Sequence, residues 1–159
     1  NHVMNIFFAL FPLDKLKIFG FEPGARMLSS AELETLQREQ KNTTQPDFFS
    51  VGDNANVAIE LKTSTKSSLG QLEKYAKFND SIGVLSKPLT IHMLTPYEAT
   101  KVFADQVSTF KAADIRYVSF KQWYAFLEEI GTSNEVERKL VDGMAAYLHS
   151  YFGDITNGD

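Results

Sequence analysis

The feature that most constrains the fold is a pair of strand-like segments joined by a short polar turn. Residues 47–51 and 56–63 are rich in apolar and β-branched side chains, and Gly52-Asp53-Asn54-Ala55 lies between them. Glycine, aspartate and asparagine favour the tight turns of β-hairpins. The sequence therefore predicts an antiparallel hairpin, which needs further strands or a helix packed against it to be stable.

The second strand of this hairpin carries an acid and a base on one face. Because side chains alternate across a strand, Glu60 and Lys62 share one face. The apolar Val57, Ile59 and Leu61 share the other face. We expect the apolar face to pack into a core and the other face to present the acid and the base, roughly 7 Å apart.

The first strand brings Asp47 to the same face. With a two-residue loop at 53–54, Asp47 lies directly opposite Glu60, and the two Cβ atoms are about 4.5–5.5 Å apart. A four-residue loop at 53–56 moves Asp47 opposite Lys62, still on the same face, and loops of three or five residues break the arrangement unless a bulge restores it. Adjacent carboxylates repel each other, and either a divalent cation or the Lys62 ammonium would offset the repulsion. The hairpin thus predicts a metal site or an ordinary cross-strand ion pair.

A helix is predicted to follow the hairpin, beginning at Ser67 or Ser68 and running to about Asn79. Gln71 and Tyr75 are four residues apart and are therefore neighbours on one helical face. That face borders an apolar stripe, so both side chains are expected at the edge of the core. Three lysines occupy a flanking face, where they would contact phosphates or be simply solvated: Lys66, Lys74 and Lys77.

Periodicity and capping signals predict the remaining elements. Helices are expected at residues 3–13, 30–41, 96–108, 123–130 and from 133 or 134 to about 152. Extended segments are expected at residues 15–21, 89–94 and 115–120, and a frayed tail at 153–159. Ser29 and Glu32 have the spacing of a capping box. Helices interleaved with strands indicate an α/β or α+β fold with a mixed sheet flanked by helices.

The composition of the chain excludes several kinds of functional site. The chain has 159 residues and no cysteine, which excludes disulfides, thiolate metal sites and cysteine nucleophiles. Its three histidines are far apart, and His92 is expected at a sheet surface. A net charge of −4 argues mildly against a large DNA-coating surface but permits a small cationic groove. The absence of cysteine is compatible with a reducing cytosol, and a cytoplasmic location is expected. The apolar run at residues 3–13 is too short to span a bilayer, so no membrane partner is expected.

Three motifs in order resemble the PD-(D/E)xK nuclease superfamily: Pro46-Asp47, Glu60-Leu61-Lys62 and the Gln71/Tyr75 pair. The Gln-x-x-x-Tyr element resembles the RecB-like and restriction-subunit branches. The similarity covers residues 45–75, and the strand at 89–94 then follows the helix as in that fold's core. The resemblance implies a restriction endonuclease-like fold in a single domain, 1–159, with a core at about 15–120 and a C-terminal helical extension at about 120–152.

The resemblance also implies roles for particular residues. Asp47 and Glu60 would bind Mg²⁺ or Mn²⁺, with the Leu61 carbonyl as a further ligand. Lys62 would orient or activate the attacking water, while Gln71 and Tyr75 would brace the site or touch the nucleic-acid backbone. The implied activity is hydrolysis of phosphodiester bonds, in DNA in preference to RNA.

Several alternatives stay open at this stage. The family often adds an acid from its first core helix, and the sequence offers four candidates: Glu22, Glu32, Glu34 and Glu39. The chain would act as a homodimer or within a larger nuclease assembly. A catalytically inactive module for nucleic-acid or protein binding is the alternative to an enzyme, and an unrelated α/β interaction domain is a third interpretation.

Overall fold

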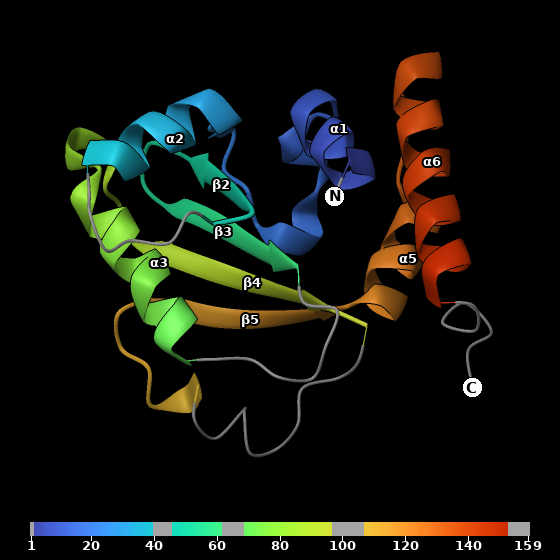
Figure 1. Cartoon of the computed structure of the whole chain (residues 1–159). Helices are drawn as coiled ribbons and strands as arrows, with labels where there is room; N and C mark the ends of the chain where they lie inside the picture. The colour runs from blue at the N-terminus through green and yellow to red at the C-terminus, as the bar shows by residue number, and fades with distance from the viewer. Residues whose placement is uncertain (1, 40–45, 62–68, 97–106, 153–159) are drawn as a thin grey trace.

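The centre of the chain is a five-stranded mixed sheet with strand order β1-β2-β3-β4-β5 (Figure 1). In this computed structural model the described residues are 2–39, 46–61, 69–96 and 107–152. The strands are β1 (Arg26–Met27), β2 (Phe48–Val51), β3 (Asn56–Leu61), β4 (Leu89–Thr95) and β5 (Asp114–Ser119). The strand β2 pairs antiparallel with both of its neighbours, β1 and β3, whereas β3, β4 and β5 are parallel. The predicted mixed α/β architecture is confirmed.

The hairpin has the register that sets Asp47 against Glu60. Phe48 pairs with Ile59, and continuing this register by one residue puts Asp47 opposite Glu60. This is the register expected for a loop centred on residues 53–54, so that prediction is confirmed. The turn also explains Gly52, because a Cβ there would lie 2.5 Å from a carboxylate oxygen of Glu22.

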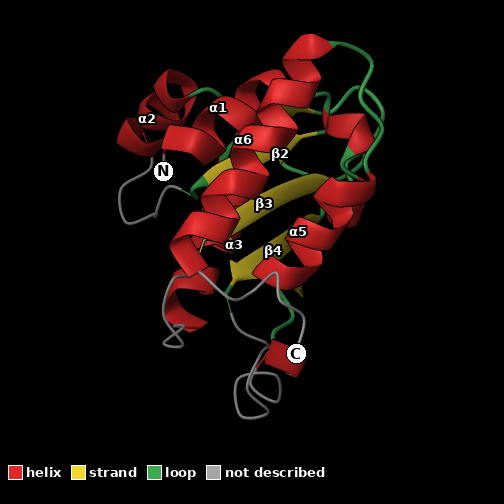
Figure 2. Ribbon diagram, turned by 90° about the vertical axis from the view of Figure 1, so that its right-hand side faces the viewer, coloured by secondary structure: helices red, strands yellow, loops and turns green. Residues whose placement is uncertain are grey.

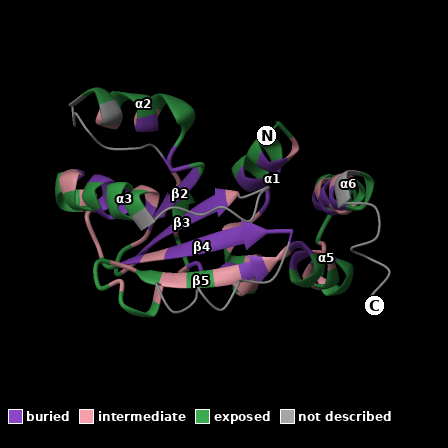
Figure 3. Cartoon of the chain, turned by 60° about the horizontal axis from the view of Figure 1, so that its bottom comes forward, coloured by how far each residue is buried: buried purple, intermediate pink, exposed green. Residues whose placement is uncertain are grey.

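Helices cover both faces of the sheet (Figures 1 and 2). They are α1 (His2–Leu10), α2 (Ser30–Glu39), α3 (Leu69–Ser81), α5 (Phe120–Glu129) and α6 (Glu135–Phe152). One core joins α1, α5 and α6 to the face of β3 that carries Val57 and Ile59. A second core joins α2 and α3 to the opposite face, which carries Ala58. Buried residues dominate β2, β3 and β4, whereas β5 at the edge is mostly half-buried or exposed (Figure 3).

Local capping signals fix three helix beginnings. Ser29 and Glu32 form the predicted capping box at α2, with each side chain bonded to the other's backbone N–H. Ser119 and Gln122 form a second capping box at α5. At α6, Asn134 accepts a hydrogen bond from a backbone N–H in the first turn. Each cap satisfies donors that a helix beginning leaves unpaired.

The segment predicted as extended, residues 15–21, is helical instead. Two short 3₁₀ turns, Leu13–Lys15 and Lys17–Phe19, occupy it, and Gly20 ends the second with a φ of 66°. The reason is packing, because Leu16 and Phe19 are three residues apart and both are buried. Leu16 links the two turns and Phe19 ends the second, and both side chains belong to the first core.

His92 is also placed differently from the prediction. It is buried against the first core, with its ring 5.4 Å from that of Phe19 in an edge-to-face contact. Burial is the main cause that lowers the pKa of His92 to about 4, so the imidazole is neutral at neutral pH. The expectation of a surface position was wrong because the 3₁₀ turns cover this part of β4.

Other predictions divide between confirmed elements and residues outside the described ranges. The first helix, the helix after the hairpin and the two C-terminal helices are confirmed with small shifts at their ends. Most of the helix predicted at 96–108 and the tail at 153–159 lie outside the described residues. None of the described helices is both long and apolar enough to cross a membrane.

Candidate active site

The site is centred on the carboxylate of Glu60, which lies on β3 beneath α3. Its side chain is only 4% exposed. One carboxylate oxygen accepts a hydrogen bond of 3.1 Å from the Gln71 amide nitrogen, and the other accepts one from the Tyr75 hydroxyl. The Gln71 amide also donates to the Tyr75 oxygen at 3.0 Å. The two motifs that sequence analysis singled out on the strand and on the helix therefore meet in one hydrogen-bonded cluster.

This arrangement corrects the prediction that the face of β3 carrying Glu60 is open. The helix α3 covers that face, and the second core contains both Ala58 of β3 and Tyr75 of α3. Strand periodicity predicts which side chains share a face, but it does not predict whether a helix covers that face. Glu60 is thus held inside the protein, at the boundary between the second core and the end of β3.

Tyr75 is the most deeply placed member of the cluster, with 1% of its surface exposed. Burial is the main cause that raises its pKa above the ordinary value of 10.0, followed by the charge and hydrogen bond of Glu60 and the charge of Asp47. The phenol therefore stays protonated at neutral pH and acts as a donor to Glu60. Its predicted position at the edge of the core is wrong, and only the half-buried Gln71 occupies such an edge.

Asp47 lies just before β2 and has an exposed side chain. Its Oδ2 accepts a hydrogen bond of 2.9 Å from the backbone N–H of Leu61, the residue that follows Glu60. Pro46 and Phe48 on either side are buried, which anchors the chain here. The negative charge of Asp47 is also one of the smaller causes that raise the pKa of Tyr75, after burial and Glu60. One carboxylate is therefore buried and braced, and the other is anchored but open to solvent.

The chemistry of these donors suits a hard cation. Carboxylate and carbonyl oxygens are the ligands preferred by Mg²⁺ and Mn²⁺. In the described part of the chain, no three acidic, histidine or cysteine side chains gather closely enough to hold a metal. The predicted ligands among the described residues are Asp47, Glu60 and the Leu61 carbonyl, and their role stays a prediction.

The sequence offers four candidates for a further acid, of which the fourth is Glu39. Within the described residues, none of the other three, Glu22, Glu32 and Glu34, forms a group with Asp47 and Glu60 that could hold a metal. Glu22 accepts a hydrogen bond of 3.0 Å from the Asn54 backbone, at the turn end of the hairpin. Glu32 caps α2 and pairs with Arg26 at 3.1 Å. Glu34 is exposed on α2, and the side chain of the fourth candidate lies outside the described part.

The predicted lysines have different outcomes. Lys74 and Lys77 are exposed on α3, consistent with either phosphate contact or solvation. Lys62 and Lys66 lie outside the described residues, so their expected roles stay predictions.

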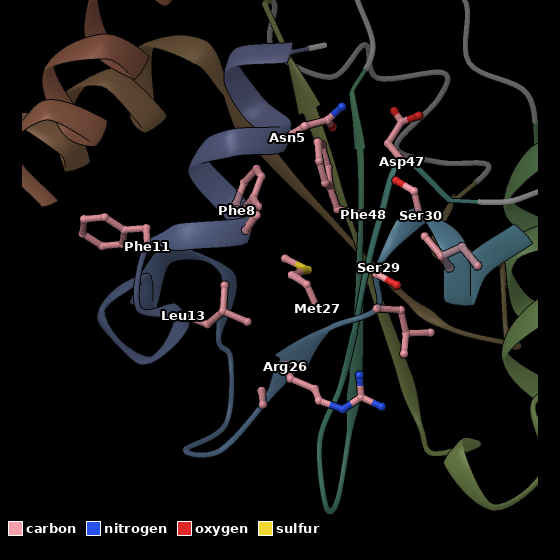
Figure 4. A pocket seen from close by; sticks show the side chains of 14 residues that line it. Asn5, Phe8, Phe11, Leu13, Arg26, Met27, Ser29, Ser30, Asp47 and Phe48 are labelled. Atoms are coloured by element: carbon pink, nitrogen blue, oxygen red, sulfur yellow. The ribbon is translucent and has the colours of Figure 1, made fainter. Parts of the chain in front are cut away.

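Sequence analysis missed a cavity that opens beside Asp47. It has a volume of about 510 Å³ and is bounded by α1, α2, β1 and the start of β2 (Figure 4). Asn5 of α1 and Asp47 both line it. The one sequence signal for this cavity is Asn5, a polar residue in the apolar run of the first helix. That signal does not indicate that α1 lies beside α2 and β1, which are distant from it in sequence.

Comparison with known proteins yields no significant match to a protein-family model, to a curated protein or to a solved structure.

Proposed function

We propose that the chain is a metal-dependent nuclease of the PD-(D/E)xK type, which hydrolyses phosphodiester bonds in DNA in preference to RNA. The observation that carries the proposal is the cluster around Glu60. Its carboxylate is held by Gln71 and Tyr75 from α3, and Asp47 lies across the hairpin from it. The helix motif donates to the Glu60 carboxylate and the Asp47 motif is anchored on the neighbouring Leu61 backbone, so the three motifs of the resemblance lie close together, which supports a shared function.

A restriction endonuclease-like fold is part of the proposal. The antiparallel strands β1, β2 and β3 are followed by α3, and β4 then lies parallel to β3. This agrees with the order of hairpin, helix and strand that the resemblance implies. The helices α5 and α6 follow β5, and their buried side chains belong to the same core as Val57 and Ile59 of β3. The agreement in element order supports the fold assignment.

Each residue of the site would have a separate role in the proposed reaction. Gln71 and Tyr75 fix the rotamer and direction of the Glu60 carboxylate through neutral hydrogen bonds. Asp47, anchored on the Leu61 backbone, presents a carboxylate to solvent where a phosphodiester can approach. A Mg²⁺ or Mn²⁺ ion bound by Asp47, Glu60 and the Leu61 carbonyl would neutralise phosphate charge and make the attacking water more acidic. Lys62 would orient that water.

The proposal is tested by cleavage of linear duplex, circular and single-stranded DNA and of RNA, with Mg²⁺ or Mn²⁺. Asp47→Asn keeps the size of the side chain but removes its charge, so it should abolish cleavage and weaken cation binding measured by calorimetry. Asp80→Asn is the matched control, because Asp80 is an exposed aspartate on α3 outside the cluster. Full activity in Asp47→Asn, or equal loss in both variants, would refute the site.

A second candidate function is a catalytically inactive module that binds nucleic acid or protein. One observation favours it, namely that the described residues supply only two acidic ligands to the site. The same assays separate the two functions. Nucleic-acid binding without cleavage of any substrate, and without cation binding, would support the inactive module. Action as a homodimer or within a larger assembly stays a prediction.

A further inference from the structure

Two buried asparagines join the start of β3 to the end of α3. The side-chain amide of Asn56 donates to Asn79 Oδ1 at 2.8 Å and to the Leu85 carbonyl, also at 2.8 Å. Asn79 Nδ2 in turn donates to the Lys87 carbonyl at 2.7 Å. Asn56 is fully buried and Asn79 is only 5% exposed. These bonds are therefore shielded from water, and they tie together a strand, a helix and the segment before β4.

The asparagine pair belongs to the same two stripes of side chains as the candidate active site. On β3, Asn56 and Glu60 are four residues apart and share one face, because side chains alternate along a strand. On α3, Gln71, Tyr75 and Asn79 follow one another at intervals of four and share one helical face. Glu60 accepts hydrogen bonds from the first two of these side chains, and Asn56 bonds to the third. The helix is thus joined to the strand by hydrogen bonds at both ends of one stripe.

The spacing of the two sets of bonds agrees on the strand and on the helix. Four strand residues span roughly 13 Å, and the eight helical steps from Gln71 to Asn79 span about 12 Å. Between the two ends the contact is apolar, and the strand contributes Ala58, which is fully buried and small. Apolar contacts are non-directional, whereas a hydrogen bond requires one partner at one distance. The hydrogen bonds therefore determine where along the strand the helix lies.

We propose that Asn56 and Asn79 are positioning residues of the candidate active site. They hold α3 at the place along β3 where Gln71 and Tyr75 reach Glu60. This inference rests on the proposed function and adds two residues to its site. The bond from Gln71 to Glu60 is already 3.1 Å long, so a shift of α3 by about 1 Å away from the carboxylate would break it.

Stability alone does not require an asparagine pair at this place. Two apolar side chains of the same shape can replace a buried hydrogen-bonded pair at little cost. Buried polar groups can instead specify one arrangement among several that pack equally well. A displacement of about 1 Å caused by a change far from the reacting atoms can lower a rate about 100-fold. The pair is therefore expected to affect the site more than its contribution to stability would indicate.

The test removes the asparagine pair and observes Tyr75. Asn79→Leu has a similar volume and loses both of its side-chain bonds. Glu137→Leu is the matched control, because Glu137 is also a buried, hydrogen-bonded polar residue but lies on α6. The ¹³Cζ resonance of Tyr75, assigned by its absence in Tyr75→Phe, reports the hydrogen bond from the phenol to Glu60. This measurement does not depend on cleavage.

In the wild type the Tyr75 resonance should stay that of a protonated phenol well above pH 10.0, because burial and the Glu60 charge raise its pKa. Asn79→Leu should shift the resonance toward those of exposed tyrosines and start its titration at lower pH. It should also lower cation affinity and kcat about 10–100-fold with KM nearly unchanged, as does loss of groups that orient a ligand. Glu137→Leu should change none of these quantities in the folded protein.

A second variant covers the case in which Asn79→Leu does not fold. In Asn79→Asp, a protonated carboxyl accepts from Asn56 and donates to the Lys87 carbonyl, so it reproduces both bonds. The ionised carboxylate accepts but cannot donate. The Tyr75 resonance of Asn79→Asp should therefore match that of the wild type in mild acid and move away from it as the pH rises.

Several outcomes would overturn the inference. They are an unchanged Tyr75 resonance in folded Asn79→Leu, an unchanged resonance in Asn79→Asp at every pH, and an equal change in Glu137→Leu. An unchanged kcat in Asn79→Leu despite a displaced resonance would also overturn it. Residues that act through the same carboxylate are not additive, so fully additive losses of rate when Asn79→Leu is combined with Tyr75→Phe would overturn it as well.

The two proposals fail in different ways. Cleavage that requires Asp47, together with a normal Tyr75 resonance in Asn79→Leu, would leave the nuclease standing and overturn the positioning role. A Tyr75 resonance displaced in Asn79→Leu but not in Glu137→Leu, with no cleavage of any substrate by the wild type, would support the positioning of α3 and overturn the nuclease.

Discussion

Replacing Tyr75 with phenylalanine removes one hydroxyl from the centre of the site and leaves the ring in place. The hydroxyl donates to the Glu60 carboxylate, and both side chains are buried. A hydrogen bond to a charged group contributes roughly 1.5–3 kcal/mol, and its loss leaves a buried acceptor undersatisfied. We therefore expect Tyr75→Phe to lower the free energy of unfolding by about 2 kcal/mol near neutral pH.

The pH dependence gives this prediction a distinctive signature. Burial and the Glu60 charge raise the pKa of Tyr75 above 10.0 in the folded protein. Above pH 10.0 the unfolded chain releases the phenolic proton while the folded protein retains it. The stabilisation is therefore fully present below that pH and declines as the pH rises above it. The difference in the free energy of unfolding between the wild type and Tyr75→Phe should therefore become smaller at alkaline pH.

Urea unfolding, followed by the fluorescence of the single tryptophan, measures both effects. Trp123 is fully buried and so reports on the folded core. Tyr124→Phe is the matched control, because the Tyr124 hydroxyl bonds to Glu128 and the side chain is only half-buried. Tyr124→Phe should lower the free energy of unfolding by less than about 0.5 kcal/mol, as most surface substitutions do. A Tyr75→Phe protein as stable as the control, or a gap independent of pH, would refute the reasoning.

The same variant bears on function. Groups that orient a ligating side chain typically affect metal affinity or activity by about 10–100-fold. Tyr75→Phe should therefore reduce cation affinity or cleavage by about that factor, while Tyr124→Phe leaves both unchanged. Equal activity in the two variants would mean that Tyr75 has a purely structural role.

Three further predictions concern the scaffold. Gly52→Ala should lower the free energy of unfolding by about 1–3 kcal/mol, because its Cβ would overlap backbone and carboxylate oxygens; Gly131→Ala, with open space around it, should be nearly neutral in the same urea titration. Burial lowers the pKa of His92 to about 4, so stability present above pH 6.5 should be lost as the pH falls toward 4, by up to about 3 kcal/mol. His92→Leu should flatten this acid decline, and an unchanged slope would contradict the prediction. The hydrogen bond from Lys15 is the main cause that lowers the pKa of Glu137. Glu137→Gln should therefore be less stable than the wild type above pH 4.5 and equally stable in stronger acid. Thermal melts over that range test this, and a difference in melting temperature that persists in strong acid would contradict it.

The hairpin could be predicted from sequence because two local signals agree. Alternating side chains define the faces of β3, and the turn residues define the register. Together they set Asp47 against Glu60 before any tertiary contact is considered. The pairing of Gln71 with Tyr75 follows equally from helical spacing. These parts of the candidate site depend only on interactions between neighbours in the chain or across one turn.

What could not be predicted depends on contacts between distant segments. The closure of α3 over Glu60, the burial of His92 beneath the 3₁₀ turns and the cavity between α1 and α2 all join residues far apart in sequence. The strand β1 has only two residues, too few to show a period. Periodicity identifies an apolar face but does not say which element covers it, which is why Tyr75 was expected at an edge and is buried instead.

The character of the donors to Glu60 bears on whether this hairpin holds a cation or an ordinary ion pair. Burying a carboxylate is unfavourable, and an apolar residue of similar size is often at least as stabilising. The two donors that reach Glu60 from α3 are an amide and a phenol, both neutral. They solvate the carboxylate without cancelling its charge, and Asp47 adds a second negative charge nearby. An arrangement selected only for stability would gain from a positively charged donor at Gln71 or Tyr75. Neutral donors do not cancel the charge of Glu60, so this hairpin requires a positive partner, either the Lys62 ammonium or the cation proposed above.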